Sequence, residues 1–278
     1  IWGARVLPES NRDSNVRRPD MLGSILITAA TSALALSIVK GSEWGWSSAR
    51  VVGLLTFTVV GTGFLARRIS RHEDPILPLP LLAIPSFRVA ISSLFLFGLG
   101  FFSSMLVVVL YLTEMAGYST VRTGFGVSVL AIMAFTTANF SGRLADRFGH
   151  RRIAVPGMCS FILGCLWLYQ NAGANPSFFV DVFPALVLMG AGIGSGPTLL
   201  SAAAVSEVDP SNFSVAGAVA QTARQLSGAI GISIAVAISG SNADEDAFRA
   251  TFLYLTIVAA MSAIAALKLP AANATRKL

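Results

Sequence analysis

Charged side chains are scarce in this sequence. Of its 278 residues, 12% are charged and 54% are hydrophobic, whereas soluble domains usually carry about a quarter of charged residues. This shortage excludes a water-soluble globular domain. The apolar residues come in blocks of about 20, the length of helix that crosses a hydrocarbon core of ~30 Å. A spanning barrel would need shorter segments of alternating polarity, so we expect an all-α, polytopic membrane protein.

Groups that bind metals or perform covalent chemistry are equally few. The two cysteines, Cys159 and Cys165, lie in one apolar block, where a helix would hold their Cα atoms about 9 Å apart, too far for a disulfide. The two histidines, His72 and His150, have no neighbouring Cys or second His, so we expect no metal site. No Ser/His/Asp grouping or paired carboxylates lie beside the apolar blocks, which argues against an enzyme and a bound cofactor.

The beginning of the chain also lacks two features. It opens with Ile1-Trp2-Gly3 instead of an initiating methionine. No basic leader followed by a short apolar core, the pattern of a signal peptide, is present there. We therefore expect a fragment or a truncated gene product.

Eight apolar runs bounded by charges or by Gly, Pro and Ser are interpreted as membrane-spanning helices. The second run is short, and we expect it to extend backwards over Trp46 to Ala49, with the tryptophan at the membrane interface. The predicted spans are 21–39, 51–66, 89–113, 123–141, 153–170, 182–205, 215–240 and 250–267.

The distribution of Lys and Arg predicts the orientation of these spans. Fifteen of the 20 lie on one side if the amino terminus is cytoplasmic, and four lie on the other, while Arg224 stands within a span. Because basic residues accumulate in cytoplasmic loops, both termini are expected inside the cell, with the chain in the plasma membrane. Nucleic-acid binding would require one continuous basic surface, and these residues are spread over four separate segments, so we expect no such partner. The inner residues are Arg5, Arg12, Arg17, Arg18, Arg67, Arg68, Arg71, Arg88, Arg143, Arg147, Arg151, Arg152, Lys268, Arg276 and Lys277.

The strongest local pattern is a short basic segment between the fourth and fifth predicted spans, which reads G-R-L-A-D-R-F-G-H-R-R. Gly142 permits close approach of helices, and Gly149 permits a tight turn. Asp146 can lie beside the positive amino end of a neighbouring helix. The basic side chains of the segment can pair with acidic groups or lipid phosphates, and they include Arg147, Arg151 and Arg152.

This segment closely resembles the G-x-L-A-D-R-x-G-R-R loop of the major facilitator superfamily. One position departs from that pattern, because His150 stands where the family usually has Arg or Lys. The resemblance implies that the segment controls conformational change, with the residues Gly142, Asp146, Arg147, Gly149, Arg151 and Arg152.

Other segments resemble the fourteen-helix drug:proton antiporter branch of that family. They are R-V-L-P-E-S at 5–10, R-P-D-x-x-G at 18–23 and W-G-W-S at 44–47. The stretch 217–231, with Gln221, Arg224 and Gln225, resembles the penultimate helix of the branch. Thr113 stands where the branch often has Gln, which weakens the inference of a substrate.

This resemblance implies a domain organisation. A cytoplasmic segment at 1–20 would precede two linker helices at 21–66, a cytoplasmic connection at 67–88, a second six-helix transport domain at 89–267 and a cytoplasmic tail at 268–278. The first six-helix domain would be a missing partner upstream. The six helices also suit two three-helix units of opposite orientation, 89–170 and 182–267, as expected for inverted repeats.

Glycines alternate in the sixth predicted span. No strand precedes them and no Lys-Ser/Thr follows, so they are not a nucleotide-binding loop. In an apolar span they are expected to let helices touch, while the proline bends the helix. These residues are Gly190, Gly192, Gly194, Gly196 and Pro197.

Hydroxyl and aromatic side chains recur at helical spacing along the third predicted span. Such a face would suit a cavity for bulky apolar molecules, and packing against other helices is the alternative. The candidate cavity residues are Ser93, Phe97, Phe101, Ser104 and Tyr111, with Met189, Ser195 and Thr198 from the sixth span.

Arg224 is the one charge well inside a predicted span. An intramembrane charge is a candidate functional residue, and we weigh gating near the inner mouth against a side chain that extends to the interface. Carboxylates occur only near span ends, at Glu114, Asp181 and 244–246. A proton-coupling carboxylate is therefore expected in the missing domain.

These observations predict part of a secondary active transporter in the lipid bilayer. It would export small hydrophobic or cationic drug-like compounds in exchange for protons by alternating access, with the proton gradient as its energy source and no cofactor. The alternatives are a metabolite facilitator of the same superfamily and a non-transporting remnant or scaffold.

Overall fold

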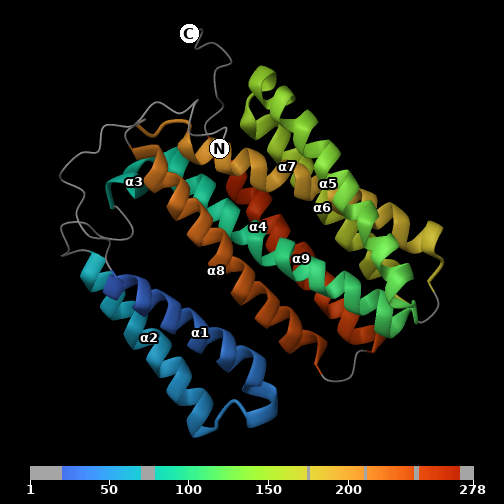
Figure 1. Ribbon diagram of the computed structural model, residues 1–278, viewed down its shortest axis with the longest axis horizontal. Coiled ribbons are helices and arrows are strands. Elements are labelled where there is room, and N and C mark those ends of the chain that lie inside the picture. Colours follow the sequence, from blue (N-terminus) through green and yellow to red (C-terminus); the bar gives the residue numbers. More distant parts are fainter. Residues whose placement is uncertain (1–20, 70–78, 174–175, 210–211, 241–243, 270–278) are drawn as a thin grey trace, which may run out of the picture.

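The computed structural model describes residues 21–69, 79–173, 176–209, 212–240 and 244–269, and long helices lying side by side dominate it (Figure 1). Within these ranges every regular element is helical. The predicted all-α, polytopic fold is therefore confirmed. Several basic residues of the predicted orientation lie outside the described ranges: Arg5, Arg12, Arg17, Arg18, Arg71, Arg276 and Lys277.

Each predicted span corresponds to one long helix. The largest boundary error is in the fourth span, which was expected to end at 141 and continues to Phe148. The connection expected at 67–88 contains a short helix and the first turn of the next. In chain order the elements are α1 (Met21–Trp44), α2 (Ala49–Ile69), α3 (Leu79–Ala83), α4 (Pro85–Leu110), η2 (Tyr111–Met115), α5 (Thr120–Phe148), α6 (His150–Asn171), η3 (Phe178–Val182), α7 (Phe183–Val205), α8 (Phe213–Ser239) and α9 (Glu245–Ala266).

Seven of the described helical segments are long and apolar enough to cross a membrane. Helix α8 corresponds to the eighth predicted span but does not reach the same hydropathy. The reason is its polar middle, where Gln221, Arg224 and Gln225 interrupt the apolar sequence. A helix with such residues in a membrane has to place them against protein or water.

Helices α1 and α2 form an antiparallel hairpin at the edge of the molecule, where α1 packs against α8 (Figure 1). The turn uses Gly45, whose φ of 84° favours glycine. Contrary to expectation, Trp46 is not part of α2, which begins at Ala49. The two helices are joined by a hydrogen bond in which the Thr58 hydroxyl donates to the Ala30 carbonyl oxygen at 3.3 Å.

The other six long helices form one bundle of two interlocked three-helix units, α4–α6 and α7–α9. Helix α4 packs against α8 and α9 of the other unit, and α7 packs against α5 and α6 in the same way. Contacts between consecutive helices within a unit are much sparser. The first helix of each unit therefore packs against the second and third helices of the other unit. This symmetric exchange of partners is the arrangement expected of inverted repeats.

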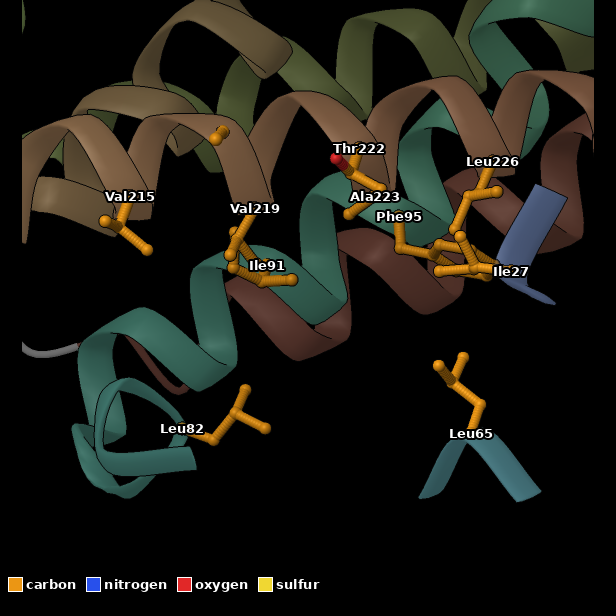
Figure 2. A pocket seen from close by; sticks show the side chains of 11 residues that line it. Ile27, Leu65, Leu82, Ile91, Phe95, Val215, Val219, Thr222, Ala223 and Leu226 are labelled. Carbon is orange, nitrogen blue, oxygen red and sulfur yellow. The ribbon is translucent and has the colours of Figure 1, made fainter. Parts of the chain in front are cut away.

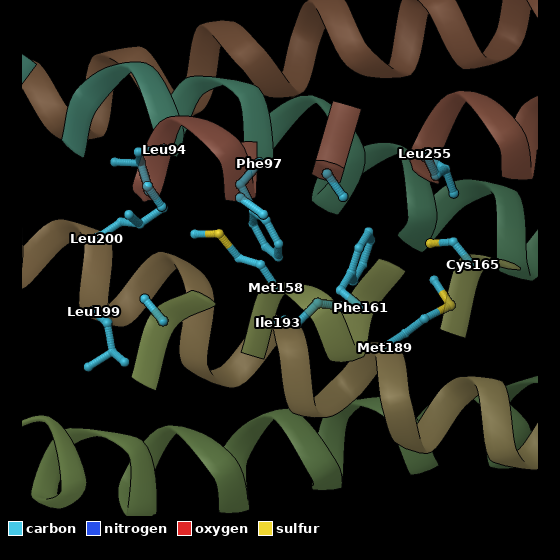
Figure 3. Close-up of a cluster of buried hydrophobic side chains, with 14 of the residues drawn as sticks. Leu94, Phe97, Met158, Phe161, Cys165, Met189, Ile193, Leu199, Leu200 and Leu255 are labelled. Carbon is cyan, nitrogen blue, oxygen red and sulfur yellow. The ribbon is translucent and has the colours of Figure 1, made fainter. Parts of the chain in front are cut away.

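The core of the bundle lies where α4, α6, α7 and α9 meet (Figure 3). The rings of Phe97 and Phe161 lie 5.2 Å apart at its centre, and Met158 and Met189 fill the space around them with no exposed surface. Both cysteines are free, as their spacing predicted. Extensive apolar packing of this kind holds four helices at defined distances.

Candidate functional site

The basic segment that follows the fourth predicted span is a helix end and not a loop. Helix α5 continues through Phe148, and α6 begins at His150, so a single residue joins them. That residue, Gly149, has φ 89° and ψ 148°, and its N–H donates to the Ala145 carbonyl oxygen at 2.8 Å. Glycine is required here because other residues rarely adopt a positive φ.

The charged side chains of this α5–α6 junction point away from the bundle core. Asp146, Arg147 and Arg152 are exposed, and Arg151 is half-buried. Within the described part of the chain, none of these four groups forms an ion pair. A Cβ atom on Gly142 would meet no heavy atom within 4 Å, so close helix approach there is not observed. The junction therefore presents unpaired charge at one end of the bundle.

The glycines of α7 lie where this helix touches its neighbours. A Cβ atom on Gly190 would come within 2.6 Å of the Leu130 carbonyl oxygen of α5, and one on Gly192 within 2.7 Å of the Gly157 carbonyl oxygen of α6. Gly194 faces α5, with the Ala138 nitrogen 2.9 Å from such an atom, and Gly196 faces the Phe97 ring of α4 at 3.1 Å. Pro197 is buried in the same helix. Helix α7 can therefore approach three helices at once only because these side chains are absent.

Two further glycines complete these contacts and were not singled out from the sequence. Gly157 and Gly164 of α6 face α7, where an added Cβ on Gly164 would come within 2.8 Å of the Ala185 carbonyl oxygen. They lie seven residues apart in one apolar helix. Small residues at such a spacing mark a helix-packing face, so the signal was present in the sequence.

The stripe of hydroxyl and aromatic residues on α4 lies between helices and not on a cavity wall. Ser93, Phe97 and Ser104 have no exposed surface, and Phe101 is half-buried. The Tyr111 ring contacts the edges of Phe248 and Phe252 at 5.4 and 5.6 Å. The structure therefore places these residues in helix packing, and their contact with a substrate stays a prediction.

The three candidates from α7 differ in exposure. Met189 and Ser195 are buried, and the Ser195 hydroxyl donates to the Ala191 carbonyl oxygen at 2.9 Å. Within α7 only Thr198 and Phe183 are exposed. Since α7 packs against α4, α5 and α6, Thr198 marks the sector of α7 that these helices leave open.

Helix α8 carries a polar row near its middle. Gln221 and Gln225 are exposed, and the Arg224 Nη2 donates to Gln221 Oε1 at 2.8 Å. The Arg224 Nε is buried and has no hydrogen-bond partner among the described residues. Arg224 lies eleven residues after the first residue of α8, about 16 Å along the helix axis, so its charge is far from both helix ends.

An apolar pocket lies between the α1–α2 hairpin and the bundle (Figure 2). Its volume is about 340 Å³, and Thr222 is the one polar residue among the described residues that line it. Leu65 of α2 faces Ile91 and Val219 of the bundle across it (Figure 2). None of the expected cavity residues lines this pocket. Its lining has the chemistry that holds a hydrophobic molecule.

Comparison with known proteins agrees with this architecture. Residues 90–278 match the family described as Major Facilitator Superfamily. The chain is 26% identical over 226 residues to "Multidrug resistance protein Stp" of Mycobacterium tuberculosis, which covers 81% of this chain and 42% of that protein. It is 25% identical to "Tetracenomycin C resistance and export protein" of Streptomyces glaucescens (84% and 43% covered) and 28% identical to "Puromycin resistance protein pur8" of Streptomyces alboniger (86% and 48%).

The chain thus spans less than half the length of these relatives. Its apolar helices and its relatives identify a multi-pass membrane protein. The family match extends over α4 to α9, from residue 90 onward. This chain therefore belongs to the major facilitator superfamily.

Proposed function

We propose that this chain is the second transport domain, with two linker helices, of a proton-driven exporter of hydrophobic or cationic compounds. The family match points to a transporter and not to an enzyme. The observation that carries the proposal is the symmetric exchange of partners between α4–α6 and α7–α9. Interlocked repeats of this kind move as one body, and alternating access is the rocking of one such body against another.

The polar row of α8 supports the proposal that a second six-helix domain packs against this chain. Gln221 and Gln225 are exposed in the middle of a helix of membrane-spanning length. Polar side chains at this depth face protein or a water-filled pathway, because contact with lipid tails would leave them without hydrogen bonds. We propose that another six-helix domain of the complete protein covers this row and that the substrate pathway runs between the two.

The relatives support the substrate class. Their names refer to multidrug resistance, to tetracenomycin C resistance and export, and to puromycin resistance. The apolar pocket between the hairpin and α8 offers this chain a surface for hydrophobic compounds. We therefore propose hydrophobic compounds as substrates. Cationic compounds are included because the polar row of α8 could solvate a charged group.

The coupling group is proposed to lie in the other domain. The carboxylates of the described residues lie in turns or near helix ends, such as Glu114 in η2, Asp181 in η3 and Asp246 in the first turn of α9. A proton-coupling carboxylate has to be reached from both sides of the membrane in turn, which favours a position deep in a span. We propose the plasma membrane as the location, with both termini cytoplasmic.

Reconstituted vesicles test this function. The complete protein would be placed in vesicles loaded with a fluorescent hydrophobic cation, and a pH gradient would be imposed and then collapsed with a protonophore. We expect uphill movement of the dye only while the gradient exists. Downhill movement that ignores the gradient would show a facilitator, and no movement in either condition would favour a non-transporting protein.

A further inference from the structure

A second groove lies between α4 and α9. Its volume is about 510 Å³. The start of α4 and the end of α9 both line it, so the two helices run in opposite directions along its walls. Its lining residues are Arg88, Val89, Ser92, Leu96, Met261, Ile264, Ala265 and Lys268.

Positive charge is concentrated at one end of this groove. Arg88 is in the first turn of α4, and Lys268 follows the last residue of α9 by two positions. Both side chains are exposed, and neither has an ion-pair partner among the described residues. Ser92 lies one helical turn further along α4 and adds a hydroxyl group. Two cations and a hydroxyl group, with no acidic partner among the described residues, suit a phosphate group.

The rest of the groove is apolar and faces outward. Met261 and Ile264 are 50% and 63% exposed, although both are large hydrophobic residues. Leu96 lies eight residues beyond Arg88 on α4, which places it about 12 Å deeper along the helix axis. The groove therefore changes from cationic to hydrophobic over the distance that separates a lipid headgroup from the middle of its chain.

We propose that this groove binds one anionic phospholipid, with its phosphate between Arg88 and Lys268 and an acyl chain along Leu96, Met261 and Ile264. Basic pockets between membrane helices bind anionic headgroups, and the apolar strip contributes the contact that a soluble phosphate lacks. The site is separate from the apolar pocket beside α8, because the two share no lining residue. Lipid binding in this groove does not depend on the transport function.

Native mass spectrometry of the complete protein tests this site. The protein would be titrated with phosphatidylglycerol and with phosphatidylcholine carrying the same acyl chains. We expect tighter retention of phosphatidylglycerol, and Arg88→Gln with Lys268→Gln should weaken it roughly tenfold, because each cation near the membrane surface contributes to anionic lipid binding. Ala265→Trp, which keeps both cations and fills part of the groove, should also lower retention.

A matched pair of substitutions controls for net charge. Arg67→Gln with Arg143→Gln removes two exposed cations outside the groove and should leave retention unchanged. Equal loss in the control pair would show general electrostatic attraction and overturn the site. Unchanged retention in the Arg88/Lys268 variant, or in Ala265→Trp, would overturn it as well.

Discussion

Gly192 of α7 lies directly against Gly157 of α6, and a Cβ atom on Gly192 would come within 2.7 Å of the Gly157 carbonyl oxygen. The same atom would lie 2.8 Å from the Phe161 nitrogen. The nearest obstacle is the Phe161 Cβ atom. The backbone holds this atom in place, so none of the three atoms can rotate away. The spacing between α6 and α7 therefore depends on the absence of one methyl group.

Gly192→Ala should destabilise the bundle by about 2 kcal/mol, since overpacking of a close contact typically costs 1–3 kcal/mol. Thermal unfolding of the purified protein in detergent measures this effect. Gly124→Ala is the control, because a Cβ atom at that exposed position of α5 would meet nothing within 4 Å. Equal melting temperatures for the two variants would contradict the close contact.

The sequence predicted the helices well, and it left open what their faces contact. Long apolar blocks predict spans because a membrane leaves the backbone few alternatives to a helix. Helical spacing also placed Ser93, Phe97 and Ser104 on one face of α4 correctly. It did not reveal what that face meets, because serine and phenylalanine suit both a cavity and a helix contact. The structure shows a helix contact, with the Phe97 ring against Phe161.

The end of α5 shows a second limit. Charges at Arg143, Asp146 and Arg147 indicate the membrane boundary, so the span was expected to end at 141. The backbone remains helical to Phe148. Leaving the membrane does not end a helix, and α5 continues until Gly149 turns the chain. Charge therefore predicted the edge of the apolar region and not the end of the helix.

Asp146→Asn in the complete protein should lower efflux about fivefold, an effect of ~1 kcal/mol. Asp146 precedes the amino end of α6, which begins at His150, and a negative charge near a helix amino end typically contributes about that much. Membrane abundance should stay unchanged, because Asp146 is exposed and fills no core volume. Initial rates of dye efflux at equal abundance measure the change. Asp246→Asn, at an exposed position in the first turn of α9, is the control. Wild-type efflux from both variants would show that the α5–α6 junction only fixes the membrane topology.

Ala218→Trp should fill the apolar pocket beside α8 and lower the efflux of hydrophobic compounds roughly threefold or more, because such pockets bind by enclosing apolar surface. Ala250→Trp adds the same side chain at an exposed position of α9 that does not line the pocket. Efflux rates of the two variants at equal abundance give the comparison. If both variants transport equally, the pocket takes no part in substrate binding.

Cysteine labelling checks the orientation proposed from the basic residues. In a background with Cys159→Ser and Cys165→Ser, a cysteine at Ala243 should react with an impermeant thiol reagent in intact cells, and one at Ala274 should not. Both positions lie outside the described residues. The reverse pattern of labelling would place the termini outside the cell.

The most direct test of the account compares this chain with the complete protein in the same energised vesicles. Residues 1–278 should insert, since each span satisfies its own backbone hydrogen bonds, and insertion is checked by protease protection. The complete protein should move the dye uphill while a pH gradient is present, and residues 1–278 alone should not, because alternating access requires a second bundle. Uphill, proton-dependent efflux from vesicles that contain only this chain would contradict both the half-transporter proposal and the placement of the coupling carboxylate in another domain.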